Sequence, residues 1–377
     1  MAVFSVNNLR PSYLPSPPQL LGNRLRSFSN TLLPYFDGKQ PKNSRSNPAA
    51  VPPISSVSSA DLDVHQTPAS TRGSSSGWAK FSDNVSGEWD GFGADFTAEG
   101  KPIELPENVV PEAYREWEVK VFDWQTQCPT LAQTESGSHL ISFIYKSIKL
   151  LPTVGCEADA ATRFAVQERC VTNASSECES FPFAYQSSGC YVALWPPQPI
   201  SMADYRLMEL EHCLIDPQDK ESRVRIIQLL EAGNSELKLR QITVFVEQWY
   251  GPFRNGDQLG GCAIRDSAFA ATQPLEASQV SVVWQGAAAV AAFDNTRHHS
   301  IEELRGVSVR KSVRDVDSIV LLPKQLWCSV QKTEDLETCC EAGWLLSPGH
   351  AITSKCTFSN SGELKEIAVA TETIVPL

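Results

Sequence analysis

From Trp78 onward, apolar and polar residues alternate along a series of short segments separated by turn-forming residues. Successive side chains of a strand point to opposite faces of a sheet, so a period of two predicts half-buried antiparallel strands. The segments with this pattern are residues 116–124, 205–215, 242–249, 279–286, 317–323, 351–358 and 365–375. The sequence Ser-Asn-Ser-Gly-Glu at 359–363 predicts a hairpin turn between the last two.

One segment has a different period. In residues 140–152 the apolar residues Ile141, Ile144, Tyr145 and Ile148 are spaced as on one face of a helix, and Pro152 follows. The pattern predicts a helix here. Two interpretations stay open, a helix of the core and a helix that covers the end of a barrel.

The number of predicted strands is large for one small barrel. Trp89-Asp-Gly91 recurs as Trp249-Tyr-Gly251, a short internal echo. Together with the length, the echo predicts a mainly β fold of two antiparallel barrels with one or two short helices. The polar stretch 216–223 predicts the boundary, giving an N-terminal barrel at 78–220 and a C-terminal barrel at 221–377.

Residues 1–77 have another composition. They are rich in Ser and Pro, and they hold seven basic residues but only three acidic ones. A segment of this kind buries too little apolar surface to fold, and an N-terminal Ser- and Arg-rich, acid-poor segment is typical of an organelle transit peptide. We interpret 1–77 as a plastid transit peptide and disordered leader, and expect the protein in the chloroplast stroma.

The rest of the chain is acidic. Residues 1–77 hold seven of the 32 basic and three of the 44 acidic residues, so the remainder has a net charge of −16. Nucleic-acid binding needs a basic surface, and this charge argues against it. The sequence contains no run of 18 apolar residues, so we expect no membrane span.

Gly87 and Trp89 stand at the start of the first predicted strand. A glycine two residues before a tryptophan at such an entry is typical of lipocalin and calycin barrels, where the indole closes one end of the barrel. A buried tryptophan contributes a large apolar area to a core. We therefore expect Trp89 to be structural.

Catalytic and metal-binding motifs are missing from the sequence. It contains no H-E-x-x-H, no phosphate-binding loop and no G-x-G-x-x-G motif. None of the 11 cysteines forms a C-x-x-C pair, and we interpret most of them as small buried hydrophobic residues. The pair His298-His299 is a poor metal site because adjacent side chains diverge. We predict no catalytic residues, no metal site and no cofactor.

Two groups of residues are candidates for binding a partner protein. The first is a basic patch in an acidic chain, Arg305, Arg310, Lys311 and Arg314. Locally paired charges are the competing interpretation of this patch. The second group combines aromatic residues with an arginine, the residue types enriched at interface hot spots, in Trp249, Tyr250, Phe253 and Arg254. For Trp249, packing in the core is the competing interpretation.

The segments 86–130 and 244–253 carry a resemblance to a known family. The first begins SGEWDGFGADF and the second reads VFVEQWYGPF. They resemble the two halves of a calycin-like family of plant plastids and cyanobacteria that is catalogued mainly as a domain of unknown function. The resemblance covers roughly residues 80–377, and the organisation is most similar to that of plant biogenesis factors required for the chloroplast ATP synthase.

This resemblance implies a function. It implies a stromal, non-enzymatic assembly factor that helps the catalytic head of the chloroplast ATP synthase to assemble through contacts with its γ and β subunits. An alternative stays open, because calycin-like relatives include bilin lyases. That alternative is a lipocalin-like carrier or bilin-lyase-like protein that binds a tetrapyrrole or another apolar ligand.

Overall fold

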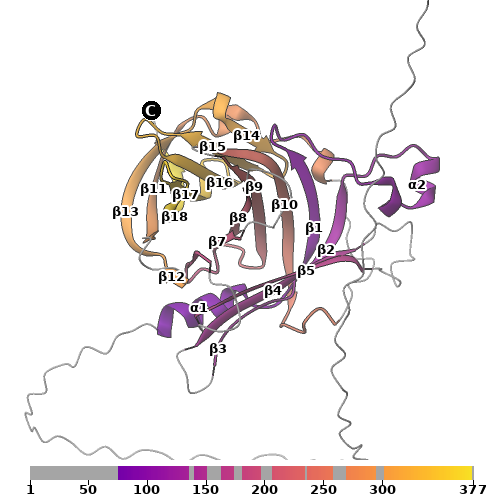
Figure 1. Ribbon diagram of the computed structural model, residues 1–377, viewed down its shortest axis with the longest axis horizontal. Helices are drawn as coiled ribbons and strands as arrows, with labels where there is room; N and C mark the ends of the chain where they lie inside the picture. Colours follow the sequence, from indigo (N-terminus) through magenta and orange to yellow (C-terminus); the bar gives the residue numbers. More distant parts are fainter. Residues whose placement is uncertain are drawn as a thin grey trace, which may run out of the picture. The chain divides into compact units, whose positions relative to one another are not determined.

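The structure is mainly β with few helices, as the sequence predicts (Figure 1). It is a computed structural model, and it describes residues 75–135, 140–150, 163–173, 181–196, 206–233, 236–257, 269–293 and 301–375. Of the predicted leader, residues 1–74 lie outside the described residues, as do His298 and His299. No helix in the described ranges is long and apolar enough to cross a membrane.

The larger sheet, called sheet A, has 11 strands in the order β12-β6-β7-β8-β9-β10-β1-β2-β4-β3, with β5 paired to β4. Its pairs are antiparallel except for β12 with β6. The strands are β1 (Glu88–Thr97), β2 (Asp123–Gln127), β3 (Thr130–Thr134), β4 (Ile141–Leu150), β5 (Arg163–Thr172), β6 (Phe183–Tyr185), β7 (Tyr191–Trp195), β8 (Arg206–Ile215), β9 (Ser222–Ala232), β10 (Leu237–Gly251) and β12 (Ile301–Glu303).

The second sheet, called sheet B, has seven antiparallel strands in the order β13-β11-β18-β17-β16-β15-β14. They are β11 (Val283–Ala292), β13 (Arg305–Val313), β14 (Ile319–Leu322), β15 (Leu326–Lys332), β16 (Thr338–Ser347), β17 (His350–Phe358) and β18 (Leu364–Ile374). The predicted hairpin at 359–363 is confirmed, because it joins β17 to β18.

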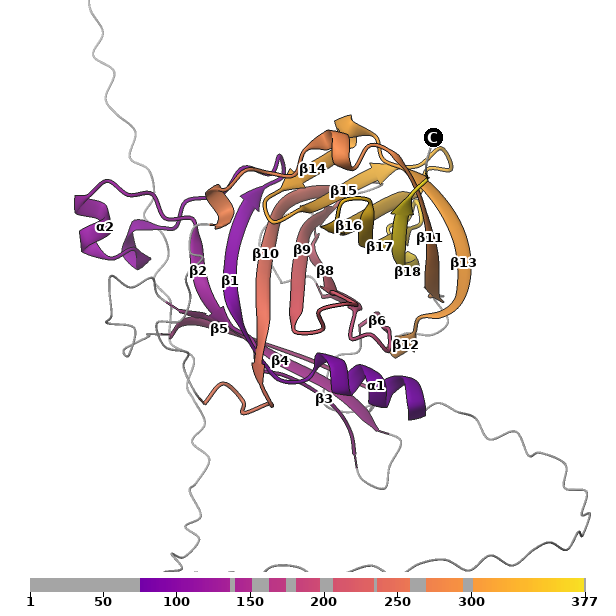
Figure 2. The same ribbon diagram turned by 180° about the vertical axis from the view of Figure 1, so that it is seen from behind.

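The middle strands of sheet A are buried on both faces. In β8 residues 210–215 are all buried, and in β9 residues 223–228 are all buried. One face packs against sheet B, where His212 Nδ1 lies 2.7 Å from Ser354 Oγ and Gln228 Nε2 donates to the Ser329 carbonyl at 3.2 Å. The opposite face is closed by the curl of sheet A itself, which brings Tyr145 of β4 to Glu211 of β8 and places its ring 5.0 Å from the guanidinium of Arg225 on β9 (Figure 2).

Helix α1 (Ser75–Val85) packs on this curl. Its residues Trp78, Phe81 and Val85 are buried at helical spacing. The ring of Phe81 lies 5.9 Å from that of Phe143 on β4 and 5.1 Å from that of Tyr185 on β6. The described part of the chain therefore begins at α1, three residues inside the range predicted as leader.

The predicted helix at 140–152 is wrong: residues 141–150 form strand β4. Phe143 and Tyr145 join the main core, whereas Ile148 and Leu150, at even positions, pack together on the other face. Apolar residues on both faces of a strand occur at odd and even positions alike, which mimics helical spacing.

The predicted strand at 116–124 is also wrong over most of its length. Residues 112–116 form a short helix, α2 (Glu112–Glu116), and only Asp123 and Trp124 belong to a strand, β2. Pro111 stands at the N-cap, and Glu118 adopts a left-handed conformation with φ of 54°. A proline start and a left-handed residue after the last turn favour a short helix over an extended strand.

The predicted boundary at 220/221 falls within a hairpin. Residues 216–221 connect β8 to β9, and these strands pair along their whole length from Arg206↔Ala232 to Ile215↔Arg223. β10 then pairs with β1 from the start of the folded part. The chain first leaves sheet A for sheet B between Gly251 and Val283 and returns to it at β12, and residues 69–377 form one unit. The polar stretch is a turn, and polarity alone does not distinguish a turn from a domain boundary.

Candidate partner-binding surface

The aromatic residues at the end of β10 form an exposed surface. The side chain of Tyr250 is 60% exposed and that of Trp249 is 37% exposed. The guanidinium of Arg254 lies 5.8 Å from the centre of the Tyr250 ring. Tyr250 and Arg254 are therefore brought together, and Trp249, the preceding residue of β10, is not a core residue.

Trp249 is held in place by two backbone carbonyls. Its Nε1 donates to the Ser86 carbonyl at 3.2 Å, and its backbone N–H donates to the Glu221 carbonyl at 2.7 Å. Gly87 has φ of +146°, and a Cβ there would lie 2.1 Å from Trp249 Nε1. Only glycine fits at this position. Trp89, two residues later, is fully buried, and Arg223 lies 4.2 Å over its ring, so the structural role predicted for it is confirmed.

A turn after β10 is fastened to β1. The carboxylate of Glu88 accepts hydrogen bonds from the backbone N–H of Arg254 and, at 3.3 Å, from that of Gly256. Asn255 and Gly256 are left-handed, with φ of 57° and 71°. The turn is therefore built in one conformation by a buried carboxylate.

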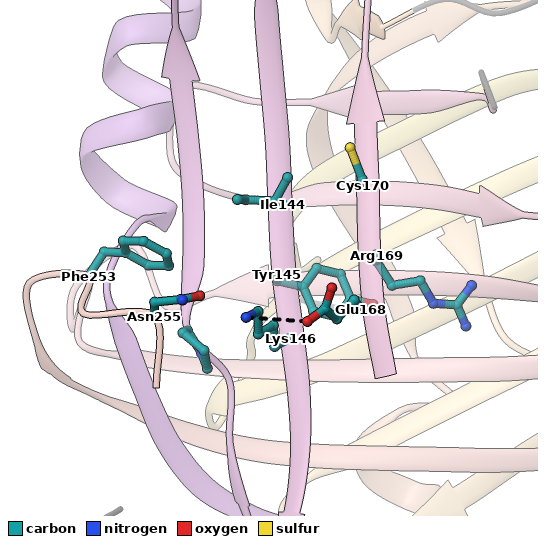
Figure 3. A pocket seen from close by; sticks show the side chains of 9 residues that line it. Ile144, Tyr145, Lys146, Glu168, Arg169, Cys170, Phe253 and Asn255 are labelled. Atoms are coloured by element: carbon teal, nitrogen blue, oxygen red, sulfur yellow. Dashed lines mark ion pairs between the residues drawn. The ribbon is translucent and has the colours of Figure 1, made fainter. Parts of the chain in front are cut away.

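The fourth predicted residue of this group, Phe253, lines a small pocket beside the turn (Figure 3). The pocket has a volume of about 150 Å³, and Lys146 and Glu168, which form an ion pair at 3.2 Å, stand at its edge. It is lined by Pro129, Ile144, Tyr145, Lys146, Glu168, Arg169, Cys170, Phe253 and Asn255. A cavity of about this size holds one benzene ring, whereas drug-sized ligands occupy roughly 300–1,000 Å³. The pocket therefore fits one side chain.

Asp90 lies next to this surface in an acidic setting. Burial, together with the neighbouring carboxylate of Glu88, raises its pKa to about 6, and a hydrogen bond with Gln127 opposes the rise. The positive charge of Arg254 acts in the same direction as Gln127. Arg254 therefore offsets part of the negative charge around Asp90.

The predicted basic patch is not an uncompensated cluster. Arg314 is only 5% exposed, and it binds Glu341 at 2.5 Å and Glu372 at 2.6 Å. Arg305 and Arg310 are exposed, but they pair with Glu303 and Glu366, each at 2.9 Å. Only Lys311 has no ion pair with a described residue. Arg314 is therefore a buried residue paired with glutamates of β16 and β18, which lie 27 and 58 residues away in the sequence, and not an exposed docking residue.

A buried ionic network fills the curl of sheet A, and the sequence did not predict it. Arg225 binds Glu211 at 3.1 Å and Glu247 at 2.9 Å, and Arg223 binds Glu247 at 2.7 Å, with all four side chains fully buried. Three aromatic side chains donate to the Glu211 carboxylate, Tyr145 at 2.5 Å, Tyr191 at 2.8 Å and Trp195 at 2.6 Å.

The arginines of the network stabilise the charged form of its two glutamates. Burial by itself would raise the pKa of Glu247, but the guanidinium groups of Arg223 and Arg225 keep it below its ordinary value. The same competition between burial and Arg225 leaves the pKa of Glu211 lowered. Each carboxylate oxygen of Glu211 and Glu247 accepts a hydrogen bond from another side chain of the protein, so the network has a structural role.

A second pocket, of about 470 Å³, lies between the turn after β9 and the turn after β17. Most of its lining is polar: Arg206, Met208, Ala232, Gly233, Glu236, Leu237, Thr338, Ser359, Asn360, Ser361, Gly362 and Glu363. The described residues include no group of three or more His, Cys, Asp or Glu placed to hold a metal ion. Of the eight cysteines in the described ranges, seven are free and buried, as expected of small hydrophobic residues, and Cys170 is disulfide-bonded.

The chain matches no protein-family model. It also matches no curated protein. Among solved structures it is similar to a protein of unknown function from the DUF3598 family of the cyanobacterium Nostoc punctiforme. That similarity has 13% sequence identity and a TM-score of 0.44, and it covers 79% of this chain and 98% of the other.

Proposed function

We propose that this protein is a non-enzymatic assembly factor of the chloroplast stroma that binds the γ and β subunits of the ATP synthase catalytic head. The observation that carries the proposal is the pair of exposed residues Trp249 and Tyr250, with the half-buried Arg254 near the Tyr250 ring and a pocket that fits one side chain beside the following turn. Aromatic and arginine residues next to a small pocket are the usual centre of a protein–protein interface.

The geometry of this surface also favours a protein partner because it is rigid before binding. Trp249 is hydrogen-bonded to the backbone at Ser86, and the following turn is fastened by Glu88. A surface that is already ordered loses little conformational entropy on association. The identity of the subunits comes from the sequence resemblance, whereas the geometry supports a protein-binding role.

The alternative, a carrier or lyase for a tetrapyrrole, has less support in the described residues. Fully buried side chains of Trp89, Arg223 and Arg225 fill the curl of sheet A. The pocket beside Phe253 is too small for such a ligand, and the larger pocket has a mostly polar lining. A carrier barrel needs an open interior with a mainly apolar lining.

The test is purification of the tagged protein from chloroplast stroma. We expect the γ and β subunits of the ATP synthase to be recovered with it, and an absorption spectrum without visible bands. Recovery of neither subunit would contradict the proposal. A coloured protein with a tetrapyrrole spectrum would support the carrier in its place.

A further inference from the structure

A second exposed aromatic residue, Trp117, stands on the segment that connects β1 to β2. Residues 98–122 connect β1 to β2, and this connection carries α2. Figures 1 and 2 show α2 projecting away from both sheets. At its tip Trp117 is 61% exposed and Val119 is 46% exposed. We call residues 103–121 the lobe.

The base of the lobe is packed against the sheet, which fixes the position of its tip. Leu105 donates its backbone N–H to the Val121 carbonyl at 2.8 Å, and both side chains pack with Trp124. Val109 and Val110 join the same apolar cluster. The apolar residues at the base are thereby used by the fold, whereas Trp117 and Val119 are left to solvent.

Trp117 has a defined position at the tip. Its backbone N–H donates to the Ala113 carbonyl at 3.0 Å, and its ring meets that of Tyr114 edge-on at 6.2 Å. The chain then reverses through the left-handed Glu118, and Val119 N–H donates to the Tyr114 carbonyl at 2.9 Å. A non-glycine residue in this conformation is uncommon and occurs often at functional sites. The turn holds the indole outward.

The charges around the indole are negative. The lobe contains five glutamates and two basic residues, one of which, Lys120, pairs with Glu104 at 3.5 Å. Glu112, Glu116 and Glu118 are exposed and form no ion pair within the described part of the chain. The open face of the ring also attracts cations, because an aromatic face carries partial negative charge.

We propose that the lobe docks an extended, lysine- or arginine-bearing segment of a partner protein, with one cationic side chain stacked on Trp117 and others facing Glu116 and Glu118. This inference rests on the proposed function, since it adds a second contact to the same partners. The acidic charge excludes nucleic acid and anionic lipid as occupants of this surface. An exposed tryptophan with acidic neighbours is complementary to a basic peptide in both apolar and charged contacts.

The test compares two variants of the recombinant protein. The lobe variant carries Trp117→Ala, Glu116→Lys and Glu118→Lys. The control variant carries Leu336→Ala, Glu334→Lys and Asp335→Lys at the turn between β15 and β16, where Leu336 is 58% exposed and also left-handed. Both variants change one exposed apolar residue and two acids. Thermal unfolding midpoints equal to that of the wild type would confirm that both variants fold.

Binding to the purified γ and β subunits is measured by biolayer interferometry at two salt concentrations. We expect the lobe variant to bind about tenfold more weakly than wild type with a flatter salt dependence, and the control variant to bind within about twofold of wild type. Wild-type affinity in the lobe variant would overturn the inference and leave the proposed function intact.

A wild-type protein that binds neither subunit would contradict the proposed function. The lobe is then tested separately, by measuring how the wild-type protein and the lobe variant bind a fluorescein-labelled peptide of alternating arginine and serine. A wild-type preference of about tenfold over the lobe variant supports the inference, and equal binding overturns it. Sedimentation tests whether a second copy of this chain covers the lobe. A dimer that the wild-type protein forms and the lobe variant does not would show this, and it would also overturn the inference.

Discussion

At the scale of single residues, arginine occurs both in the buried core and on the surface of this protein. Arg223, Arg225 and Arg314 are buried beside glutamates, whereas Arg305 and Arg310 are exposed. The sequence predicts the aromatic surface at Tyr250, because the residue types alone suggest it. It does not predict which arginines are buried, because their acidic partners lie on strands up to 58 residues away, as with Arg314 and Glu372.

The buried network leads to a prediction about Arg225. Replacement by methionine, Arg225→Met, removes the cation that joins Glu211 to Glu247 and leaves their negative charge buried with fewer partners. Breaking a buried pair in this way costs about 3–5 kcal/mol of the free energy of unfolding. Urea unfolding followed by tryptophan fluorescence measures the loss.

The matched control is Arg305→Met, which removes the exposed pair with Glu303. That change is expected to cost about 0–1 kcal/mol. Equal losses in the two variants would show that the Arg225 network contributes no more than a surface ion pair.

At the scale of elements, the sequence pattern predicts strands well where they end in clear turns. β8, β17 and β18 occupy nearly the predicted residues. It fails at β4, where apolar residues on both faces imitate a helix, and at residues 116–122, where alternating residues stand on the exposed lobe. Period alone does not say whether a neighbouring element covers a face.

The contact between β8 of sheet A and β17 of sheet B is sensitive to pH through His212. Gln228 uses its amide N–H groups on the Ser329 and Glu341 carbonyls, so its Oε1 accepts from His212 Nε2 at 3.2 Å. The other ring nitrogen then accepts from the Ser354 hydroxyl at 2.7 Å. Burial lowers the pKa of His212 to about 4, against 6.5 for the free side chain.

This lowered pKa predicts a loss of stability in acid. Between pH 6.5 and 4 the unfolded chain binds a proton that the folded protein does not, so the free energy of unfolding decreases as the pH falls through this window. The contribution of His212 to that decrease is about 3 kcal/mol. His212→Gln replaces the titrating imidazole with an uncharged amide of similar length.

Urea unfolding of wild type and His212→Gln at pH 7.5, 6 and 5 provides the measurement. The stability difference between the two proteins is expected to shift in favour of the variant as the pH falls. Parallel pH curves would show that His212 does not titrate differently in the folded and unfolded states.

At the scale of the whole chain, two curled sheets share one large apolar cluster that runs from Trp78 to Val369. The composition predicts a mainly β protein, but the pairing of β1 with β10 joins residues about 150 positions apart, and nothing in the local pattern encodes it. This long-range pairing also builds the candidate surface, since Gly87, Glu88 and Trp249 meet only across it. Sequence reasoning therefore finds the aromatic residues, and the structure supplies the backbone that presents them.

The central claim is that the end of β10 binds a protein partner, and the affinity of a surface variant tests it most directly. The variant is Tyr250→Ala with Phe253→Ala, and the control is Val309→Ala with Val313→Ala, two exposed valines on β13. The measurement is the Kd of each protein for the γ and β subunits. The account predicts a Kd about tenfold higher, or about 1.4 kcal/mol, for the surface variant and a change within about twofold for the control. A surface variant that binds both subunits as tightly as wild type would contradict it.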